Sequence, residues 1–451
     1  MCQRAVNAAD AGGGDGGASF GAAPRLSVRL PSRRVGTVLK GGLLVELEPA
    51  TVEVADLRIG SGRIAARGAA AAPEPGDEVV DLTGKLVFPG FVSAHHQLAS
   101  TLLRGARRVG SGFAAERTTR EAFAAALDGD EAEAAAAAGG LEGLSCGTTT
   151  LFDTHVGRGA VEGALSRVAR GLSGVGLRAV LAEQVRSDDG ALRECLAYAS
   201  KARGRFRGAI AVGDLGQVPD EALRAVRQAM AEAKVLGLIS VGEDPDEEAQ
   251  STQRFGRPPV ERLLDADLVG EGTVISQGVH LSWPELSSLI SRGAWLVHVA
   301  RANMASQTGH ATPVKFGVRG TLGTAGMTLD VLAEAQAAAL RASDSGQPID
   351  VLRFLANGHR LASAAFGVPV GPLREGAVAD LVVLDYQPPT AFDATTLAAH
   401  VQSGLSSRHV ESVMVDGLWR LWKRKPLAVD PVEVARAARA AADAVWKRMT
   451  T

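Results

Sequence analysis

The chain has 451 residues, roughly two to three times the usual size of one domain, which predicts a large architecture with an accessory domain and excludes a small stapled scaffold. Its 48 Lys and Arg residues nearly balance 50 Asp and Glu residues, so the net charge of -2 predicts neither a nucleic-acid partner nor a membrane partner. Cys2, Cys146 and Cys195 lie far apart with no CxxC spacing, which excludes a thiolate zinc knuckle and favours a reducing, cytoplasmic compartment.

The first 24 residues are rich in Gly and Ala. They lack a basic segment leading into an apolar one, and they contain no apolar run long enough to span a bilayer. We therefore expect 1–24 to be a disordered tail. From 25 to 81, short apolar alternations broken by Gly and Pro predict a small antiparallel sheet.

The region from 82 to 369 has a different pattern, in which short apolar or β-branched runs alternate with helical stretches rich in Ala, Leu and Glu. Eight such runs occur, at 86–94, 148–153, 177–185, 208–213, 237–242, 273–279, 294–300 and 320–325. Eight strands alternating with helices predict an α/β fold, the (β/α)8 TIM barrel, with active-site groups at the carboxyl ends of the strands. A doubly wound open sheet would alternate in the same way, but no GxGxxG or GxxxxGK[ST] motif follows any expected strand.

The last part of the chain returns to strand periodicity at 370–425, after a helix expected near 351–365. These late strands can complete the first sheet, so we expect 25–81 and 370–425 to form one composite β-sheet domain of the β-sandwich type. Apolar residues at helical spacing predict a C-terminal helix within 426–451.

Several segments carry family signatures in the same order along the chain: GKLVFPGFVSAH, CGTTTLFD, VGEDPDEE, VHVARANM, LGTAG, GPLREGAVADLVVLDY and GLSSRHVESVMVDG. With these segments the sequence resembles the amidohydrolase superfamily, and within it the chlorohydrolase-like aminohydrolases, which include cyclic-amidine and oxoguanine deaminases. The match extends from residue 82 nearly to the C-terminus, so it is more specific than any single motif. It implies a TIM barrel and hydrolysis of a non-peptide C–N bond, such as the deamination of a heterocycle.

The resemblance also implies a metal site. In the family, two histidines of the first strand, one of the fifth strand and an Asp of the eighth hold one zinc or iron ion, whose bound water attacks the substrate. Here the ligand positions hold His95, Gln97, Ser240 and Ala325, and a sixth-strand His position holds Gln277. Neither Gln nor Ser is a normal zinc donor beside a single imidazole, so we expect a degenerate site with no metal cofactor.

Two alternatives keep hydrolytic activity. One is a relocated metal site built from His96, His155, His280 or His298, although each lost ligand lies between flanking residues that match the family. The other is metal-free chemistry around Glu243 and His280, which we interpret as vestigial catalytic residues. Glu243 matches the proton-transferring Glu of the family.

Three further expectations concern the surroundings of this site. Without a metal, a nearby arginine such as Arg301 would satisfy Glu243. The acidic run 243–248 should be a solvated loop and the start of a helix. The segment 104–130 is shorter and poorer in aromatic residues than in the family, with only Phe113 and Phe123, so its role in substrate selection is expected to be eroded.

These expectations combine into a catalytically inactive pseudoenzyme that acts as a partner or regulatory subunit, either as a homodimer or in a complex with an intact homologue. The alternatives are a protein that binds a small heterocyclic ligand at the barrel mouth and an active hydrolase. Metal content separates the active hydrolase from the other two hypotheses. Ligand-dependent melting then separates the binding protein from the subunit without a ligand.

Overall fold

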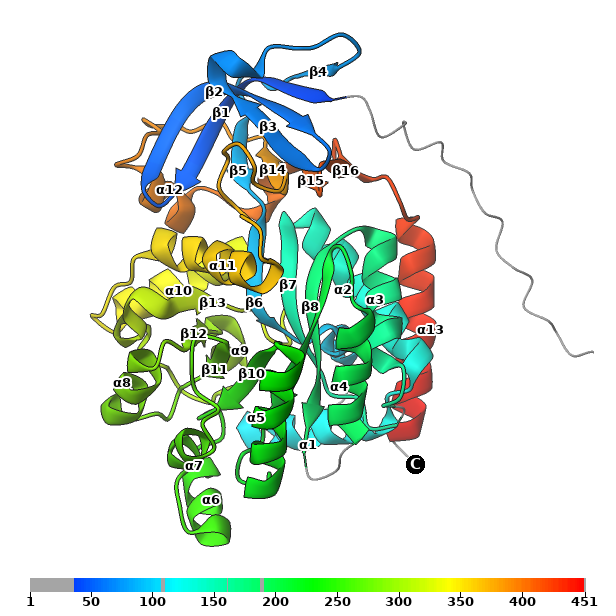
Figure 1. Cartoon of the computed structure of the whole chain (residues 1–451), viewed down its shortest axis with the longest axis vertical. Helices are drawn as coiled ribbons and strands as arrows, with labels where there is room; N and C mark the ends of the chain where they lie inside the picture. The colour runs from blue at the N-terminus through cyan, green and yellow to red at the C-terminus, as the bar shows by residue number, and fades with distance from the viewer. Residues whose placement is uncertain (1–35, 107–109, 160, 187–189, 450–451) are drawn as a thin grey trace, which may run out of the picture.

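The computed structural model describes residues 36–106, 110–159, 161–186 and 190–449. The expected tail at 1–24 lies outside the described residues, as does 25–35. Figure 1 shows a barrel with a separate sheet above it. The barrel strands are β6 (Phe91–His96), β7 (Thr148–His155), β8 (Arg178–Val185), β9 (Phe206–Val212), β10 (Leu236–Val241), β11 (Thr273–Gln277), β12 (Trp295–His298) and β13 (Gly320–Leu322).

These eight strands pair in parallel, in chain order from β6 to β13. The first and last strands meet where Ala325, just after β13, forms a parallel bridge with His96. The backbone N–H of Gln97 donates to the carbonyl oxygen of Ala325 at 3.0 Å. The N–H of Thr324 donates to the carbonyl oxygen of His95 at 2.8 Å. The predicted barrel is therefore confirmed, and the open doubly wound sheet is excluded.

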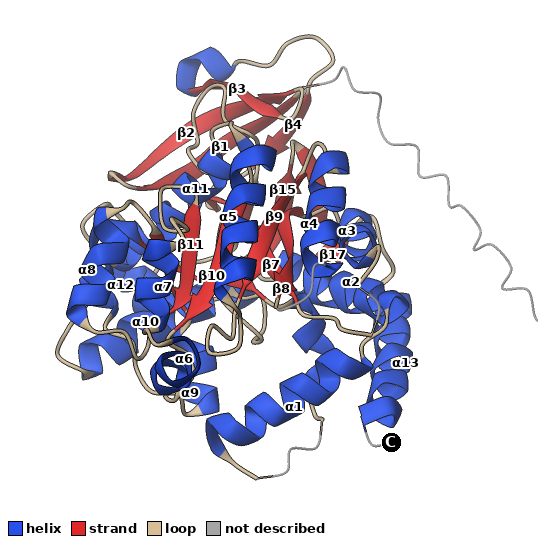
Figure 2. Cartoon of the chain, turned by 60° about the horizontal axis from the view of Figure 1, so that its bottom comes forward, coloured by secondary structure: helices blue, strands red, loops and turns tan. Residues whose placement is uncertain are grey.

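Helices surround the strands, as Figure 2 shows. They are α1 (Gly112–Ala126), α2 (Gly129–Ser145), α3 (Ala164–Val175), α4 (Gly190–Lys201), α5 (Asp220–Ala233), α6 (Glu247–Phe255), α7 (Pro259–Asp265), α8 (Trp283–Ser291), α9 (Ala300–Ser306), α10 (Val331–Asp344) and α11 (Val351–Phe366). Inside the barrel, side chains such as Phe152, Val180 and Trp295 form one apolar core. A second core lies between the strands and the helices. The barrel interior is thus filled with side chains, and only its ends are open to a ligand.

The accessory sheet has nine strands that come from both ends of the chain. They are β1 (Thr37–Leu47), β2 (Ala50–Gly60), β3 (Arg63–Arg67), β4 (Glu78–Asp81), β5 (Leu86–Pro89), β14 (Leu381–Leu384), β15 (Val410–Val415), β16 (Leu418–Trp422) and β17 (Lys425–Pro426). A short helix, α12 (Leu397–Ser403), lies between β14 and β15. Most neighbouring strands are antiparallel, whereas β1 is parallel to β4 and β5.

The run 86–94, expected as one barrel strand, is two strands that belong to different sheets. Its first half, β5, lies between β1 and β14 of the accessory sheet, and only the second half, β6, enters the barrel. Gly90 separates the two halves. A Cβ atom at Gly90 would lie 2.2 Å from the Thr149 hydroxyl, so a glycine is required where the chain passes between the sheets.

The C-terminal helix α13 (Pro431–Met449) lies within the expected segment 426–451, and Lys425 and Pro426 before it pair with β16. It packs along the flank of the barrel beside α2 (Figure 1). Val445 is fully buried there, and the Trp446 indole donates to the carbonyl oxygen of Leu102 at 2.8 Å. Among the described residues, no helix combines the length and the apolar character that crossing a membrane requires.

Candidate functional site

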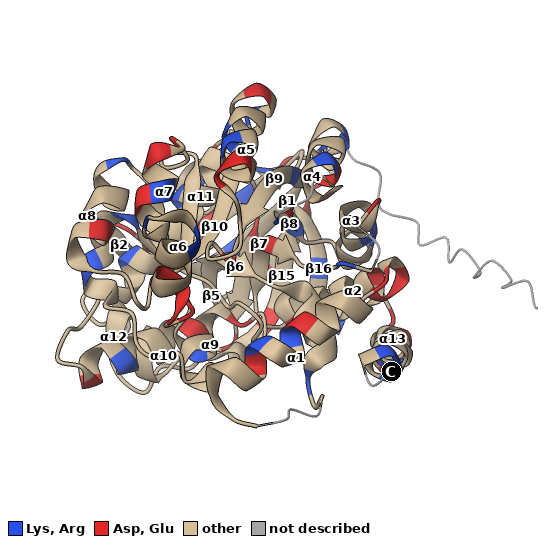
Figure 3. Cartoon of the chain, turned by 90° about the horizontal axis from the view of Figure 1, so that it is seen from below, with Lys and Arg blue, Asp and Glu red and all other residues tan. Residues whose placement is uncertain are grey.

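A cavity of about 180 Å³ lies at the carboxyl ends of the barrel strands. Figure 3 looks toward this end, which α1 borders with both acidic and basic residues. Four glutamines line the cavity: Gln97, Gln184, Gln217 and Gln250. The carboxyl ends of TIM-barrel strands are where barrel enzymes place their reacting groups, so this cavity is the candidate site.

Two of the four positions at which the resemblance implies metal ligands lie in the cavity wall. They are occupied by Gln97 and Ser240. The Ser240 hydroxyl forms a hydrogen bond of 2.8 Å with that of Ser276. His95 and Ala325 are buried, with 3% and 4% of their surface exposed. No group of three or more His, Cys, Asp or Glu side chains among the described residues is placed to hold a metal ion. The donor set therefore does not fit a zinc or iron ion.

Two of the altered positions have an unusual backbone conformation. Gln277 has φ of 79° and Ala325 has φ of 43°, in the left-handed region that few residues other than Gly, Asn and Asp adopt. Gln277 is also buried, and its Oε1 has no hydrogen-bond partner among the described residues. Such strain persists only where the surrounding structure enforces it. The surrounding barrel thus holds the backbone of both residues in this conformation.

Glu243 is paired with Arg120 of α1, whose Nη1 donates to Oε1 at 2.9 Å. An arginine satisfies Glu243, as expected, but it is Arg120 and not Arg301, which forms an ion pair of 2.6 Å with Glu334 of α10. Burial, together with the Arg120 guanidinium, lowers the pKa of His95 to about 4. The charge of Arg120 thus acts on both Glu243 and His95, two positions that the resemblance assigns to the catalytic site.

Helix α1 contributes a large part of the cavity wall, with Phe113, Arg117, Arg120 and Phe123. A second ion pair joins Arg117 to Asp244. The segment 104–130 thus lines the cavity, while its expected loss of a role in substrate selection stays a prediction. Residues three apart lie on one face of a helix, so the spacing of the two arginines was the signal that could have revealed them.

The histidines proposed as relocated ligands do not meet in this cavity. His96, His155 and His298 are buried, and burial lowers the pKa of His155 to about 4 and those of the other two to about 3. His280 is exposed in the loop after β11. None of these four described residues lines the cavity, and His96 instead contacts the Thr324 hydroxyl through Nδ1 at 2.8 Å.

The acidic run 243–248 is only partly solvated. Helix α6 begins at Glu247, in agreement with the expected helix start, but this side chain is buried. Its carboxylate accepts hydrogen bonds from the backbone N–H groups of Leu215 and Gly242, at 3.0 and 2.6 Å. Burial raises the pKa of Glu247 to about 8. Glu247 therefore fixes the loops after β9 and β10, which form one side of the cavity.

Asp153 of β7 should make stability depend on pH. Its Oδ1 accepts a hydrogen bond from the N–H of Leu98 at 2.7 Å, its Oδ2 has no partner among the described residues, and burial raises its pKa to about 7. The folded state then holds a proton that the unfolded chain, with a pKa near 3.8, releases. Hence the free energy of unfolding falls between about pH 4 and pH 7, by at most about 1.4 kcal/mol per pH unit.

The substitution Asp153→Asn should remove this contribution, because the amide replaces the protonated carboxyl without titrating. Urea unfolding at pH 5 and pH 7 would measure the change, with the exposed Asp443→Asn as a control that keeps the wild-type slope. Equal pH slopes for the wild-type protein and Asp153→Asn would contradict the prediction.

Comparison with known proteins finds a family model and relatives that match most of this chain. The family model described as the amidohydrolase family matches residues 86–420. A 5-methylthioadenosine/S-adenosylhomocysteine deaminase of Halobacterium salinarum is 30% identical over 382 residues, which cover 80% of this chain and 86% of that protein. A 5'-deoxyadenosine deaminase of Methanothermobacter thermautotrophicus is 26% identical, over 82% of this chain and 91% of that protein.

Two solved structures show the same fold. An adenosine deaminase from Xanthomonas campestris with bound zinc has a TM-score of 0.82 at 20% identity and covers 92% of this chain and 99% of its own. An atrazine chlorohydrolase from Arthrobacter aurescens, complexed with zinc, has a TM-score of 0.80 at 18% identity and covers 90% of this chain and 100% of its own.

Proposed function

Because the chain belongs to the amidohydrolase family, we propose that it is a family member that folds without a metal ion and does not hydrolyse the substrates of its relatives. One observation carries the proposal: at the ligand positions stand His95, Gln97, Ser240 and Ala325, and the cation that faces Glu243 is the guanidinium of Arg120.

The chemistry of the reaction explains why this donor set matters. Deamination needs a nucleophilic hydroxide, and water in the absence of an activating ion has a pKa of about 15.7. A general base contributes much less than an activating metal ion. Glu243 is further restrained, since one of its oxygens already accepts a hydrogen bond from Arg120.

A second function, binding of an uncharged heterocycle, is favoured by the cavity wall. Gln97 and Gln184 offer amide groups that can donate and accept along one edge of a ring, and Phe113 and Phe123 offer apolar faces. Arg117 and Arg120 are already paired with carboxylates, so a ligand without charge suits this wall better than an anion. Several relatives are named as deaminases of adenine-containing compounds, which supports a ligand of this class.

Metal analysis and ammonia release test the proposal. Protein purified without chelator should contain well under one equivalent of zinc, iron or manganese, and its melting temperature should not change with chelator. It should release no ammonia from 5-methylthioadenosine, S-adenosylhomocysteine or 5'-deoxyadenosine, and a rise in melting temperature with one of these compounds would support the binding function. Two results would overturn the proposal. One is a metal content near one equivalent in the wild-type protein that is lost in the His95→Ala variant. The other is ammonia release by the wild-type protein that is lost in the Glu243→Gln variant.

Association with a second copy or with an intact homologue stays a prediction, which the mass of the purified protein in solution would test. The same holds for the cytoplasmic compartment. It is supported by Cys146 and Cys195, which are both free thiols.

A further inference from the structure

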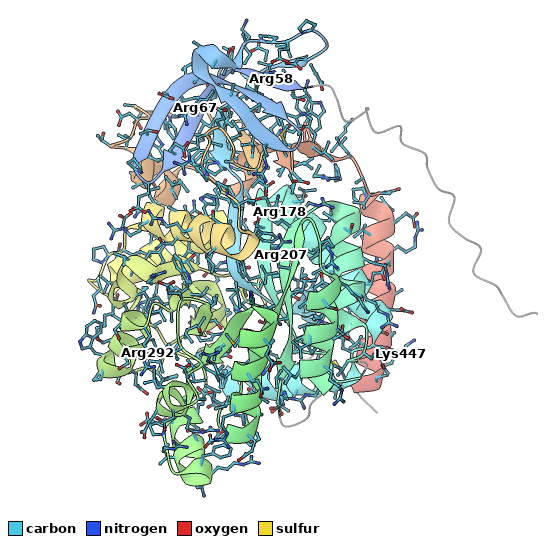
Figure 4. The ribbon with its side chains drawn as sticks, in the orientation of Figure 1. Arg58, Arg67, Arg178, Arg207, Arg292 and Lys447 are labelled. Carbon is cyan, nitrogen blue, oxygen red and sulfur yellow. The ribbon has the colours of Figure 1, made fainter. Side chains whose placement is uncertain are left out.

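Four arginines gather at the other end of the barrel, beneath the accessory sheet. Arg178 begins β8, Arg205 lies just before β9, Arg207 lies within β9, and Arg420 comes from β16. Figure 4 labels Arg178 and Arg207, which lie close together under the sheet. The length of β8 separates this cluster from the cavity by about 20 Å. The cluster is therefore distinct from the candidate site.

Two carboxylates act on this cluster, those of Asp380 and Asp416. Asp380 is fully engaged: Arg178 donates to its two oxygens at 2.8 and 3.2 Å, and the N–H of Asp416 donates to Oδ1 at 2.7 Å. The carboxylate of Asp416 lies 3.6 Å from Arg178 and is 49% exposed. Arg178, Arg205 and Arg420 thus share these two carboxylates, and Arg207 adds a further positive charge beside Arg178, so the cluster has an excess of positive charge.

Arg205 and Arg420 converge on Gly176, the residue just after α3. The Arg205 Nη1 donates to the carbonyl oxygen of Gly176 at 2.7 Å. A Cβ atom on Gly176 would lie 2.5 Å from the Arg420 Cδ and 2.7 Å from its Nε, so the absence of a side chain makes room for Arg420. Both guanidinium groups therefore lie over the same short turn at the base of the barrel.

Arg420 forms no ion pair of its own in the part of the chain that the structure describes. Its Nε is buried without a hydrogen-bond partner. Burial, followed by repulsion from Arg205, lowers the pKa of Arg420 to about 10. The residue as a whole is only partly buried, and an anion beside its guanidinium would offset the repulsion from Arg205.

We propose that Arg205 and Arg420 bind a small oxyanion of the phosphate class, either free phosphate or a phosphate monoester. The planar fork of donors on a guanidinium matches the oxygens of phosphate, and a bound anion would neutralise the excess charge. Arg178 and Arg207 frame the site but are occupied. Arg178 is held by Asp380, while Arg207 stacks on Phe366 and donates to the carbonyl oxygens of Gly204 and Phe206.

An anion bound at this position would affect how the barrel and the accessory sheet are held together. Arg205 belongs to a loop of the barrel and Arg420 to the accessory sheet, so an anion bound to both would join the two units. It would stabilise the folded chain by mass action without touching the cavity at the opposite end. The proposal is therefore independent of what the cavity binds.

Calorimetric titration with inorganic phosphate tests the site, with sodium chloride keeping the ionic strength constant. The wild-type protein should bind about one phosphate, and its melting temperature should rise more in phosphate than in chloride. Arg420→Met and Arg205→Met should each weaken binding about tenfold or more, because each removes charged hydrogen bonds. Arg292→Met is the matched control, since Arg292 is exposed at the end of α8 and lies far from the cluster (Figure 4).

A parallel titration with glycerol 3-phosphate separates the two sources, since tighter binding than that of phosphate identifies a monoester site. Removal of Arg420 relieves repulsion, so Arg420→Met without phosphate should be at least as stable as the wild-type protein. Three results would overturn the proposal: no binding of either probe beyond chloride, an equal response of Arg420→Met and Arg292→Met, or marked destabilisation of Arg420→Met in the absence of phosphate.

Discussion

A variant that combines Gln97→His, Ser240→His and Ala325→Asp is expected to bind about one zinc ion per chain, where the wild-type protein binds well under one. Gln97 and Ser240 already line the cavity, so imidazoles at these positions would reach its interior. His95 is available as the third nitrogen ligand, because its Nε2 has no hydrogen-bond partner among the described residues. The left-handed backbone at position 325 suits an aspartate better than the alanine now present.

Arg120 should limit the affinity of this variant, because its guanidinium lies beside Glu243 and would repel a divalent ion. Adding Arg120→Ala should therefore tighten zinc binding. Elemental analysis after gel filtration, followed by chelator competition, measures both effects. The single variant Gln97→His is the control. With two imidazoles and no carboxylate at position 325, it should retain little metal. A folded triple variant that holds no zinc would show that the ligand positions are assigned wrongly.

The barrel could be predicted from the sequence because of how its strands are buried. A strand covered on both faces, such as β9 with its buried apolar run at 208–212, stands out between helical segments. The same property hides the boundary between β5 and β6. Leu86–Pro89 and Phe91–His96 are both fully buried, although they belong to different sheets, and only Gly90 marks the transition.

The site was predictable only in part, because some of its residues are far apart in the sequence. Gln97 and Ser240 lie at strand ends that recognisable motifs mark in the sequence. The sequence alone could therefore place them at the barrel mouth, where both residues line the cavity. The partner of Glu243 could not be placed. Arg120 lies 123 residues earlier, and the path of the loop and helix that carry it is set by tertiary packing. The adjacent acids Glu243 and Asp244 oppose arginines one helical turn apart, a pattern that becomes meaningful only when α1 is known to cross the mouth.

Loss of the charge of Asp380 is expected to have the largest effect on stability. Asp380 and Arg178 form an ion pair of 2.8 Å with side chains only 1% and 3% exposed, and they connect the accessory sheet to the base of the barrel. Asp380→Asn would leave the Arg178 guanidinium buried in a cluster that already has excess positive charge. Breaking a buried pair by removing one partner costs about 3–5 kcal/mol, so a loss of this size is expected in urea unfolding.

Asp416→Asn is the matched control for this prediction. Its carboxylate faces the same arginine at 3.6 Å but is half exposed, so its loss should cost no more than about 1 kcal/mol. The double change Arg178→Met with Asp380→Leu should recover much of the stability, because it removes both charges together. Equal losses for Asp380→Asn and Asp416→Asn would show that burial does not set the strength of this contact. The apolar packing around the pair is present in every variant. A large loss of stability in Asp380→Asn that the double change restores would therefore show that the contact between the sheet and the barrel depends on the balance of charge between Arg178 and Asp380.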